Sequence, residues 1–331
     1  MRKGLLKIGI TAGDPAGVGP EVALKAVNAL RDDLIIPVLI GRKSVFQKNY
    51  PDIFSGYEAM TGTTGHAQLQ PGKKYICDIP LDLPVPVPGN GSPETGREAL
   101  AAIDAALDLW RSGAIEAMVT GPVSKSCIDK SGVRFTGHTE YIAGKIGEPD
   151  PFMMMYSERY RVLLATTHVP VSEITGLISR DRLLKVIRAG HASIRLIDGE
   201  RVKLAIAGLD PHCGDDGAIG TFDRTVTASA VEEAQKEGIP IEGPFAADTL
   251  FMPGSWERYN LVIAQYHDQG LIPFKTLAFD EGVNVTLGLS IVRTSVDHGT
   301  AFDIAGTNTA RWSSMMNAIR VAYSLAVKQN Q

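Results

Sequence analysis

Three apolar, β-prone stretches of this chain each end at a histidine, and this pattern constrains the fold more than any other. The stretches are RVLLATTHVP with His168, VKLAIAGLDPHCG with His212, and NLVIAQYHDQG with His267. If each is a buried strand of one mostly parallel sheet, all three imidazoles emerge at its carboxyl edge, where open α/β folds bind ligands. Three neutral imidazoles with one coordination position left free are the ligand set of a catalytic divalent metal. The pattern therefore predicts a metal site formed by these histidines.

Strand-like and helix-like segments alternate along the rest of the chain. LKIGIT, LIIPVLIG and AIEAMVT read as strands. Helices are expected to begin at Pro20, to run from Glu94 to Trp110, and to close the chain at roughly 315–327. Ser179 and Asp223 are predicted to cap two further helices. This alternation indicates an α/β/α layered fold.

Length and charge are those of an ordinary α/β enzyme. The 331 residues suffice for two domains or one large α/β domain, and no linker is evident. A formal net charge of −4 gives no sign of a nucleic-acid or anionic membrane partner. Three scattered cysteines argue against a disulfide framework, and no apolar run suits a signal peptide or a membrane span. We therefore expect a cytoplasmic protein.

The GDPAGVGP segment after the first predicted strand contains Gly13, Gly17 and Gly19. Their spacing is not the G-x-G-x-x-G dinucleotide fingerprint. Two interpretations stay open, namely a tight turn feeding a helix N-terminus and an anion-binding loop.

Other histidines lie outside the strand-end pattern. FTGHTEY places His138 and Thr139 after a glycine, as either a helix start with a surface histidine or part of a ligand site. His66 and His191 are interpreted as surface or packing residues.

The last third of the chain places polar residues beside apolar segments. YHDQGLIPFK ends at Lys275, and GVNVTLGLSIVRTSVDHGTAFDIAG contains Asn284 and Arg293. Buried cations and amides cost free energy unless they are paired. A phosphate would satisfy Lys275 and Arg293 together, with Asn284 donating a hydrogen bond. The alternative is internal salt bridges to Asp280 or Glu281.

These motifs resemble those of the 4-hydroxythreonine-4-phosphate dehydrogenase family. TAGDPAGVGPE, TGPVSK, FTGHTEY, TTHVP, AGLDPHCGDDG, GPFAADTLF, YHDQGLIPFK and the GVNVTLGLS segment occur in the family's order, from about Ile8 to Gly306. The resemblance implies an α/β/α homodimer related in fold to isocitrate and isopropylmalate dehydrogenases. Its active site would lie in an interdomain cleft at the dimer interface. We expect two subdomains with a discontinuous boundary, approximately 1–130 plus 285–331 and 131–284.

The resemblance also assigns roles to individual residues. The family's metal ligands fall on His168, His212 and His267, with one ligand supplied by the partner chain. Its phosphorylated-substrate residues fall on five positions: His138, Thr139, Lys275, Asn284 and Arg293.

The implied chemistry is oxidation of a secondary alcohol β to a carboxylate by NAD, followed by loss of carbon dioxide. A divalent ion (Zn, Mg, Co or Mn) would act as Lewis acid. NAD is bound in the family without the Rossmann fingerprint, and no cofactor-binding residue is assigned. Lys275, Asp248 and Asp268 are the predicted catalytic residues. Asp268 could equally orient a metal-bound imidazole.

The chain departs from the family pattern around one metal ligand. Asp210, Cys213 and Asp216 stand where the family usually has an amide, a methyl and a small residue, and Ser124 replaces a common His or Asn. These changes leave two substrates open: the amino acid 4-hydroxy-L-threonine 4-phosphate, or the sugar acids D-threonate and D-erythronate 4-phosphate. Retention of the phosphate residues argues against the family's branch that acts on aromatic cis-diols. Alternatives from other classes are a metal-dependent hydrolase and a non-catalytic metabolite-binding protein.

Overall fold

The computed structural model describes residues 4–60, 69–279 and 281–329, and the chain forms two compact units. Unit 1 comprises Met1–Pro149 and Leu289–Gln331, and unit 2 comprises Asp150–Gly288. The observed boundaries differ from the expected ones, because residues 131–149 belong to unit 1 and residues 285–288 belong to unit 2. His66 and Asp280 lie outside the described residues.

Unit 1 contains a parallel sheet with the strand order β3-β4-β2-β1-β5-β12. Its strands are β1 (Leu6–Thr11), β2 (Ile35–Gly41), β3 (Tyr57–Ala59), β4 (Lys74–Asp78), β5 (Ala117–Thr120) and β12 (Val292–Ser295). β1 and β2 are almost wholly buried apolar runs, as expected of parallel strands covered on both faces. The three strands predicted in this region are confirmed.

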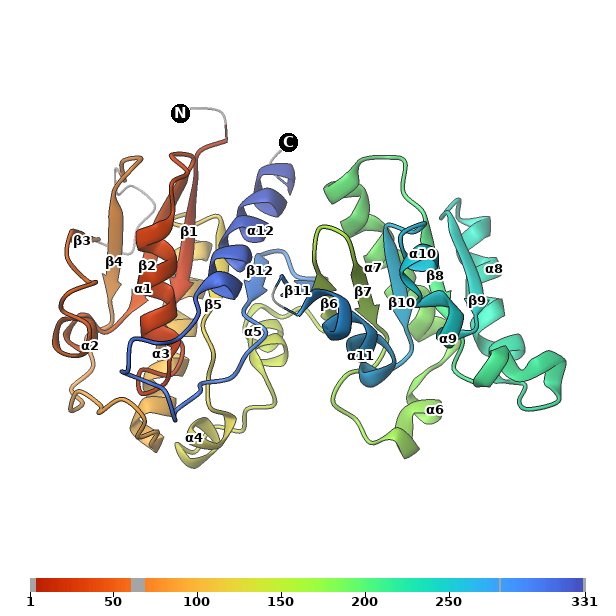
Figure 1. The fold of residues 1–331 in the computed structure, drawn as a ribbon, viewed down its shortest axis with the longest axis horizontal. Helices are drawn as coiled ribbons and strands as arrows, with labels where there is room; N and C mark the ends of the chain where they lie inside the picture. Colours follow the sequence, from red (N-terminus) through yellow and green to blue (C-terminus); the bar gives the residue numbers. More distant parts are fainter. Residues whose placement is uncertain (1–3, 61–68, 280, 330–331) are drawn as a thin grey trace. The chain divides into compact units, whose positions relative to one another are not determined.

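Helices cover both faces of the unit 1 sheet (Figure 1). They are α1 (Gly19–Ala29), α2 (Lys43–Asn49), α3 (Pro93–Arg111), α4 (Lys125–Lys130), α5 (His138–Ile146) and α12 (Ser313–Gln329). α3 packs its apolar stripe, which includes Leu100, Ile103 and Leu107, on one face. α1 and α12 contact each other on the opposite face. Unit 1 therefore has the predicted α/β/α layers.

Unit 2 contains a mixed sheet with the order β11-β6-β7-β10-β8-β9. Its strands are β6 (Phe152–Tyr156), β7 (Arg161–Leu164), β8 (Leu204–Ala207), β9 (Ile241–Phe245), β10 (Leu261–Ala264) and β11 (Val283–Leu287). β6 is antiparallel to both β11 and β7, whereas β7, β10, β8 and β9 run parallel. The parallel part follows from the crossover helices that separate these strands in the chain.

Short and long helices surround the unit 2 sheet. The α-helices are α6 (Ile174–Leu177), α7 (Arg180–Asp198), α8 (Ala228–Lys236), α9 (Ala247–Leu250), α10 (Pro253–Trp256) and α11 (His267–Ala278). Helical turns also occur at η1 (Val171–Glu173), η2 (Pro211–Gly217) and η3 (Asp223–Thr227), the last of which is π-helical. The predicted cap of α7 is confirmed, because the Ser179 hydroxyl accepts from the Arg182 N–H at 3.1 Å.

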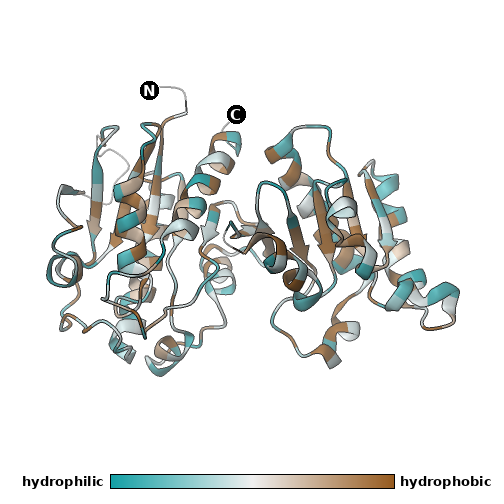
Figure 2. Cartoon of the chain, viewed as in Figure 1, coloured by the Kyte–Doolittle hydropathy of each residue, from teal (hydrophilic) through white to brown (hydrophobic). Residues whose placement is uncertain are grey.

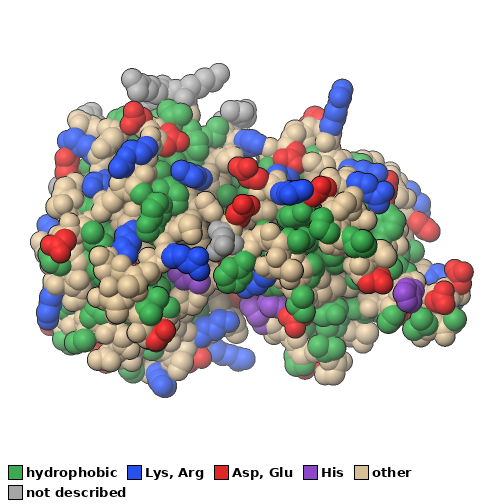
Figure 3. Space-filling model, viewed as in Figure 1, with side chains coloured by type: hydrophobic (Ala, Val, Ile, Leu, Met, Phe, Trp, Pro, Cys, Tyr) green, Lys and Arg blue, Asp and Glu red, His purple; other side chains and the backbone are tan. Residues whose placement is uncertain are grey.

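Hydropathy and charge are distributed as in a globular α/β protein. The strands in the interior of each sheet are the most hydrophobic segments (Figure 2). Acidic and basic side chains both occur over the visible surface (Figure 3). No helix in the described ranges is long and apolar enough to cross a membrane.

Candidate active site

Three neighbouring strands of unit 2 carry the predicted histidines beyond their carboxyl ends. β10 lies between β7 and β8 and is parallel to both. His168 follows β7, His212 follows β8, and His267 opens α11 shortly after β10. Because the strands are parallel, the three histidines follow the same edge of the unit 2 sheet. The predicted strands are confirmed, and metal binding stays a prediction.

His168 and His267 lie close enough together to bind one ion. Their ring centroids are 5.5 Å apart, and the ring planes make an angle of 44°. Two imidazoles bound to one ion at about 2.1 Å, with a near-tetrahedral angle, would have centroids about 5 Å apart. Nδ1 of His267 is 2.7 Å from Oδ1 of Asp268. A proton shared with this carboxylate leaves Nε2 as the metal-binding atom, so the pair fits a divalent ion.

A hollow of about 210 Å³ opens beside this pair. It is lined by Thr167, His168, Val169, Val171, Ile174, Tyr266, His267 and Asp268. This volume can hold an ion together with several water ligands.

His212 does not join the other two histidines within one chain. In the part of the chain that the structure describes, no three His, Cys, Asp or Glu side chains form a group able to hold a metal ion. The family resemblance implies that one ligand comes from a partner chain. That sharing stays a prediction.

The loop of His212 has an unusual left-handed backbone. His212, Cys213, Asp215 and Asp216 have φ values of 52°, 56°, 45° and 53°, and Gly214 between them has 84°. A left-handed conformation costs about 1–2 kcal/mol for each non-glycine residue. Such a run persists only where the surrounding structure holds it in place.

Asp223 is one of the groups that hold this loop, and its predicted role as a helix cap is wrong. Its fully buried carboxylate accepts hydrogen bonds from the backbone N–H groups of Leu209 and Asp210, at 2.9 and 2.8 Å. It also accepts one from the Thr227 hydroxyl at 2.7 Å. Phe222 stands at the cap position of the π-turn, ahead of α8. Asp223 thus turns toward the His212 loop because the loop's N–H groups need a buried acceptor.

Two departures from the family pattern have local structural roles. Oδ2 of Asp210 accepts a hydrogen bond from the Phe222 N–H at 3.3 Å, which closes the base of the His212 loop. The Ser124 hydroxyl accepts from the Cys127 N–H at 3.2 Å and caps α4. Neither observation requires a change of substrate.

Asp248 lies near the same loop. It is an exposed residue in the first turn of α9. Burial is the main cause that raises the pKa of the Cys213 thiol, and the carboxylates of Asp223 and Asp248 add to it. Cys213 is therefore a neutral thiol, and Asp248 is an acidic side chain within electrostatic range of the residue next to His212.

Unit 1 holds a buried cation beside a neutral imidazole. Nε and Nη2 of Arg293, which is 2% exposed, both donate to the Thr120 hydroxyl, at 3.2 and 2.6 Å. Burial lowers the pKa of Arg293 to about 10, so the guanidinium stays charged at neutral pH. Burial, followed by the charges of Arg293 and Lys125, lowers the pKa of His138 well below its usual value. Nε2 of His138 is buried and has no hydrogen-bond partner among the described residues.

The remaining predicted substrate residues are distributed over both units. Thr139 follows His138 in the first turn of α5, in unit 1. Lys275, on α11, and Asn284, on β11, belong to unit 2, and both are half-buried. The side-chain oxygen of Asn284 is buried without a hydrogen-bond partner in the described part of the chain. The convergence of these predicted substrate residues on one phosphate stays a prediction. The alternative of internal salt bridges also stays a prediction; of its two proposed acids, Glu281 is exposed.

The GDPAGVGP segment forms a tight turn before α1. Gly13 has a φ of 72°, and a Cβ there would lie 2.3 Å from the carbonyl oxygen of Pro122. The fully buried Asp14 accepts from the Ala16 N–H at 3.0 Å and from the Thr95 hydroxyl at 3.2 Å. The turn interpretation is therefore confirmed, and anion binding stays untested.

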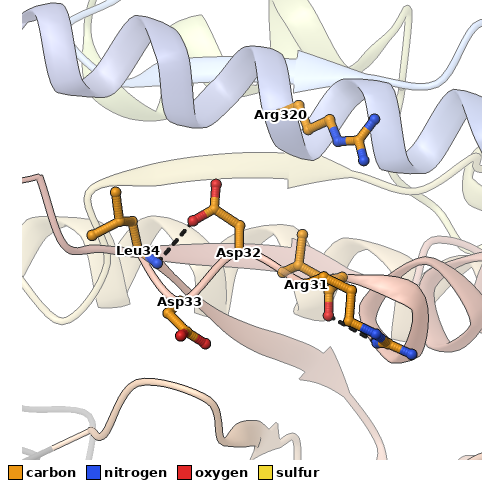
Figure 4. Close-up of a pocket in the computed structure, with 6 residues that line it drawn as sticks. Arg31, Asp32, Asp33, Leu34 and Arg320 are labelled. Atoms are coloured by element: carbon orange, nitrogen blue, oxygen red, sulfur yellow. Dashed lines mark hydrogen bonds between the residues drawn. The ribbon is translucent and has the colours of Figure 1, made fainter.

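A second hollow, of about 500 Å³, lies in unit 1 (Figure 4). Residues 30–34, between α1 and β2, form it together with Arg320 of α12. Asp32 accepts a hydrogen bond from the Leu34 N–H, and Arg31 donates to backbone carbonyls close to it in the chain. The hollow adjoins the amino end of β2, so it is not the ligand edge of the sheet.

The sequence patterns did not single out Gln265, a polar residue at the end of the β10 segment. It is fully buried, and its Nε2 donates to the carbonyl oxygen of Ala207 and to the Thr227 hydroxyl, both at 3.0 Å. A glutamine inside the apolar run NLVIAQYH was the available signal, because buried amides need partners.

Comparison with known proteins identifies close relatives over nearly the whole chain. The family model of "Pyridoxal phosphate biosynthetic protein PdxA" matches residues 33–322. A 4-hydroxythreonine-4-phosphate dehydrogenase of Desulforapulum autotrophicum is 39% identical over 323 residues, which cover 95% of this chain and 94% of that protein.

Solved structures give the same result. The 4-hydroxythreonine-4-phosphate dehydrogenase of Klebsiella pneumoniae has a TM-score of 0.87 and 34% identity, with 98% of this chain and 99% of that chain covered. A β-decarboxylating dehydrogenase of Thermococcus kodakarensis has a TM-score of 0.52 and 15% identity, with coverage of 96% and 83%. The second likeness concerns the fold alone, and it confirms an α/β/α fold shared with a β-decarboxylating dehydrogenase.

Proposed function

We propose, from the premise that this chain belongs to the family of the pyridoxal phosphate biosynthetic protein PdxA, a specific dehydrogenase activity. The relatives are named dehydrogenases, so the chain is an oxidoreductase. The reaction we propose is the NAD-dependent and metal-dependent oxidative decarboxylation of a 4-phosphorylated 3-hydroxy acid. The substrate would be of the 4-hydroxy-L-threonine 4-phosphate type. A homodimer with a shared site and a cytoplasmic location are parts of the same proposal.

The observation that carries this proposal is the pair of imidazoles of His168 and His267 at neighbouring strand ends. The carboxylate of Asp268 contacts Nδ1 of His267, which would leave Nε2 of that ring for a metal ion. A divalent ion bound there, with His212 as the third predicted ligand, would supply Lewis acidity toward the alcohol oxygen of the substrate.

The residues of unit 1 are suited to a phosphorylated substrate. Arg293 supplies a permanent charge, and its contacts to Thr120 hold the guanidinium in place. His138 stays neutral, so its buried Nε2 can take part in a hydrogen bond without adding charge. Lys275 and Asn284 are the proposed contacts from unit 2. A phosphate bound there would accept charge-assisted hydrogen bonds from the guanidinium and the ammonium.

Proton transfer needs a group that takes the hydroxyl proton as the hydride leaves for NAD. Asp268 is hydrogen-bonded to Nδ1 of His267, which favours a role in orienting this imidazole. Asp248 and Lys275 are then the candidate bases. Loss of carbon dioxide from the resulting β-keto acid leaves an electron pair on the adjacent carbon, which a proton must quench.

The test is the reduction of NAD, followed by absorbance, with a divalent ion present. 4-Phosphohydroxy-L-threonine, D-threonate 4-phosphate and D-erythronate 4-phosphate should be compared side by side. Preference for the amino acid supports the proposed substrate, and preference for a sugar acid assigns the chain to the other branch. Release of inorganic phosphate without NAD reduction would instead identify a hydrolase.

A further inference from the structure

We propose that a buried chain of polar side chains, made of Asp223, Thr227 and Gln265, positions the His212 loop against the strand end that leads to His267. These side chains would thereby set the position of His212, and with it the affinity for a divalent ion of the site to which His212 contributes. These are positioning residues, since they act through the loop and not on the substrate. The inference rests on the proposed function, because it presupposes that His212 is a metal ligand.

The first link joins Asp223 to the loop. Its carboxylate accepts from the N–H groups of Leu209 and Asp210, which precede Pro211 and the left-handed turn that begins at His212. That turn places His212 in a conformation that L-residues adopt only under constraint. Fixing the two preceding N–H groups supplies such a constraint on the side of the loop nearest β8.

The second link joins the loop to β10. The Thr227 hydroxyl donates to Oδ1 of Asp223 and accepts from Nε2 of Gln265. The same Nε2 also donates to the carbonyl oxygen of Ala207, the last residue of β8. Gln265, which directly follows β10, therefore bonds across the gap to the end of β8 and to Thr227.

A third contact supports the same gap. The Gln265 N–H donates to Oε1 of Gln269 at 2.7 Å, and Nε2 of Gln269 donates to the Gly208 carbonyl at 2.7 Å. The backbone pairing of β10 with β8 ends at Ile263 and Ile206. Beyond this point side chains replace the ladder, so they determine how far apart the two histidine-bearing segments lie.

Burial makes this series of hydrogen-bonded side chains sensitive to substitution. Asp223, Thr227 and Gln265 are all fully buried. A buried polar group that loses its partner keeps its full desolvation penalty, so one change propagates along the chain of bonds. Outer groups that orient metal ligands typically change metal affinity by about 10- to 100-fold when they are mutated.

The test compares metal binding by the full-length wild type and the variant Asp223→Asn. An amide presents an N–H where the carboxylate accepts from backbone N–H groups, so one bond becomes a repulsion. Affinities for Mn²⁺ and Co²⁺ would be measured by calorimetry, together with the visible absorption of the Co²⁺ complex. We expect a loss of affinity of about 10- to 100-fold and an altered Co²⁺ spectrum.

Controls separate positioning from stability. Glu21→Gln changes another fully buried carboxylate, in unit 1, whose Oε1 accepts from Lys25 and from the Ala310 N–H. It should lower the melting temperature and keep the metal affinity. If Asp223→Asn does not fold, Thr227→Val decides the question, and Thr227→Ser should restore wild-type affinity.

The outcomes distinguish this inference from the proposed function. A folded Asp223→Asn or Thr227→Val variant with wild-type affinity and Co²⁺ spectrum would overturn the positioning role alone. A wild-type protein that binds no divalent ion would overturn the metal-dependent function, and this inference with it.

Discussion

The hydroxyl and the backbone N–H of Thr166 both donate to the carbonyl oxygen of Gln265, at 2.8 and 3.1 Å. Each of these residues lies two positions before a histidine, His168 in one case and His267 in the other. These two hydrogen bonds therefore hold together the two chain segments that lead to His168 and His267. This explains why the rings approach each other in the isolated chain.

Replacement of His168 by alanine should remove metal-dependent activity. We expect metal affinity to fall by at least about 10-fold, because one of the ligands is lost. His191→Ala, on the half-buried face of α7, is the matched control and should keep both properties. Calorimetric titration with Mn²⁺ and the rate of NAD reduction would be measured for both. Equal metal affinity in the two variants would exclude His168 as a ligand.

Replacement of Arg293 by alanine should weaken the binding of phosphorylated substrate. The loss expected for a desolvated charge contact is about 2–5 kcal/mol. Arg293→Lys should also bind poorly, because an ammonium cannot reproduce the paired contacts of Nε and Nη2 with Thr120. The measurement is KM in steady-state kinetics, after circular dichroism has shown that each variant is folded. An unchanged KM in both variants would rule out this role.

The stability of the protein should depend on the ionisation of His138. Its folded-state pKa lies well below 6.5, whereas in the unfolded chain it is about 6.5. Below pH about 6.5 the unfolded state binds a proton that the folded state does not, so stability decreases as the pH falls. One such group contributes a slope of at most about 1.4 kcal/mol per pH unit. The free energy of unfolding would be measured with urea between about pH 7 and about pH 5, a range that includes the unfolded-state pKa of about 6.5. Its decrease with falling pH should be shallower for His138→Gln than for the wild type. Parallel curves would contradict the prediction.

A methyl group at Gly214 should disrupt the His212 loop. Gly214 has a φ of 84°, and its Cβ would lie 2.2 Å from the carbonyl oxygen of Gly220. Gly214→Ala should destabilise the protein by at least about 1–3 kcal/mol and weaken metal binding. Gly144→Ala is the control, because it lies within α5 and the added methyl would meet no atom within 4 Å other than those of the adjoining helix backbone and its chain neighbours. It should be neutral or stabilising by up to about 1 kcal/mol. Equal melting temperatures for the two variants would show that the loop tolerates the methyl.

Asp210→Asn should preserve the fold, because an amide oxygen can accept the same hydrogen bond from the Phe222 N–H. Its free energy of unfolding should change by less than about 1 kcal/mol. The ratio of kcat/KM for the amino acid and the sugar-acid substrates then reports whether the charge at Asp210 selects between them. A ratio equal to that of the wild type assigns Asp210 to loop closure alone.

Much of the fold could be predicted because the parallel strands are nearly continuous apolar runs. β1 coincides with the predicted LKIGIT segment, and the helix predicted from Glu94 to Trp110 is contained in α3. Apolar periodicity and the capping serine before α7 are local signals, and local signals are what a sequence displays.

The polar contacts beyond the strand ends could not be predicted in the same way. Asp223 precedes a helical pattern and so resembles an N-cap, but its carboxylate bonds to Leu209 and Asp210, which lie on a different segment. The left-handed turn at His212 contains several non-glycine residues, so its sequence does not display the backbone conformation. Such features depend on tertiary contacts that outweigh local preference.

The strand order of unit 2 has a consequence for synthesis of the chain on the ribosome. β7 and β8 emerge first, yet β10, which lies between them, is made more than 50 residues later than β8. Until β10 emerges, β7 and β8 lack their shared neighbour, and the segment with His267 does not exist. In unit 1, β5 likewise lacks its neighbours β12 and α12 until the end of the chain has been synthesised. The nascent chain therefore exposes unpaired strand edges until its last third is translated, which makes early release or truncation a direct route to aggregation.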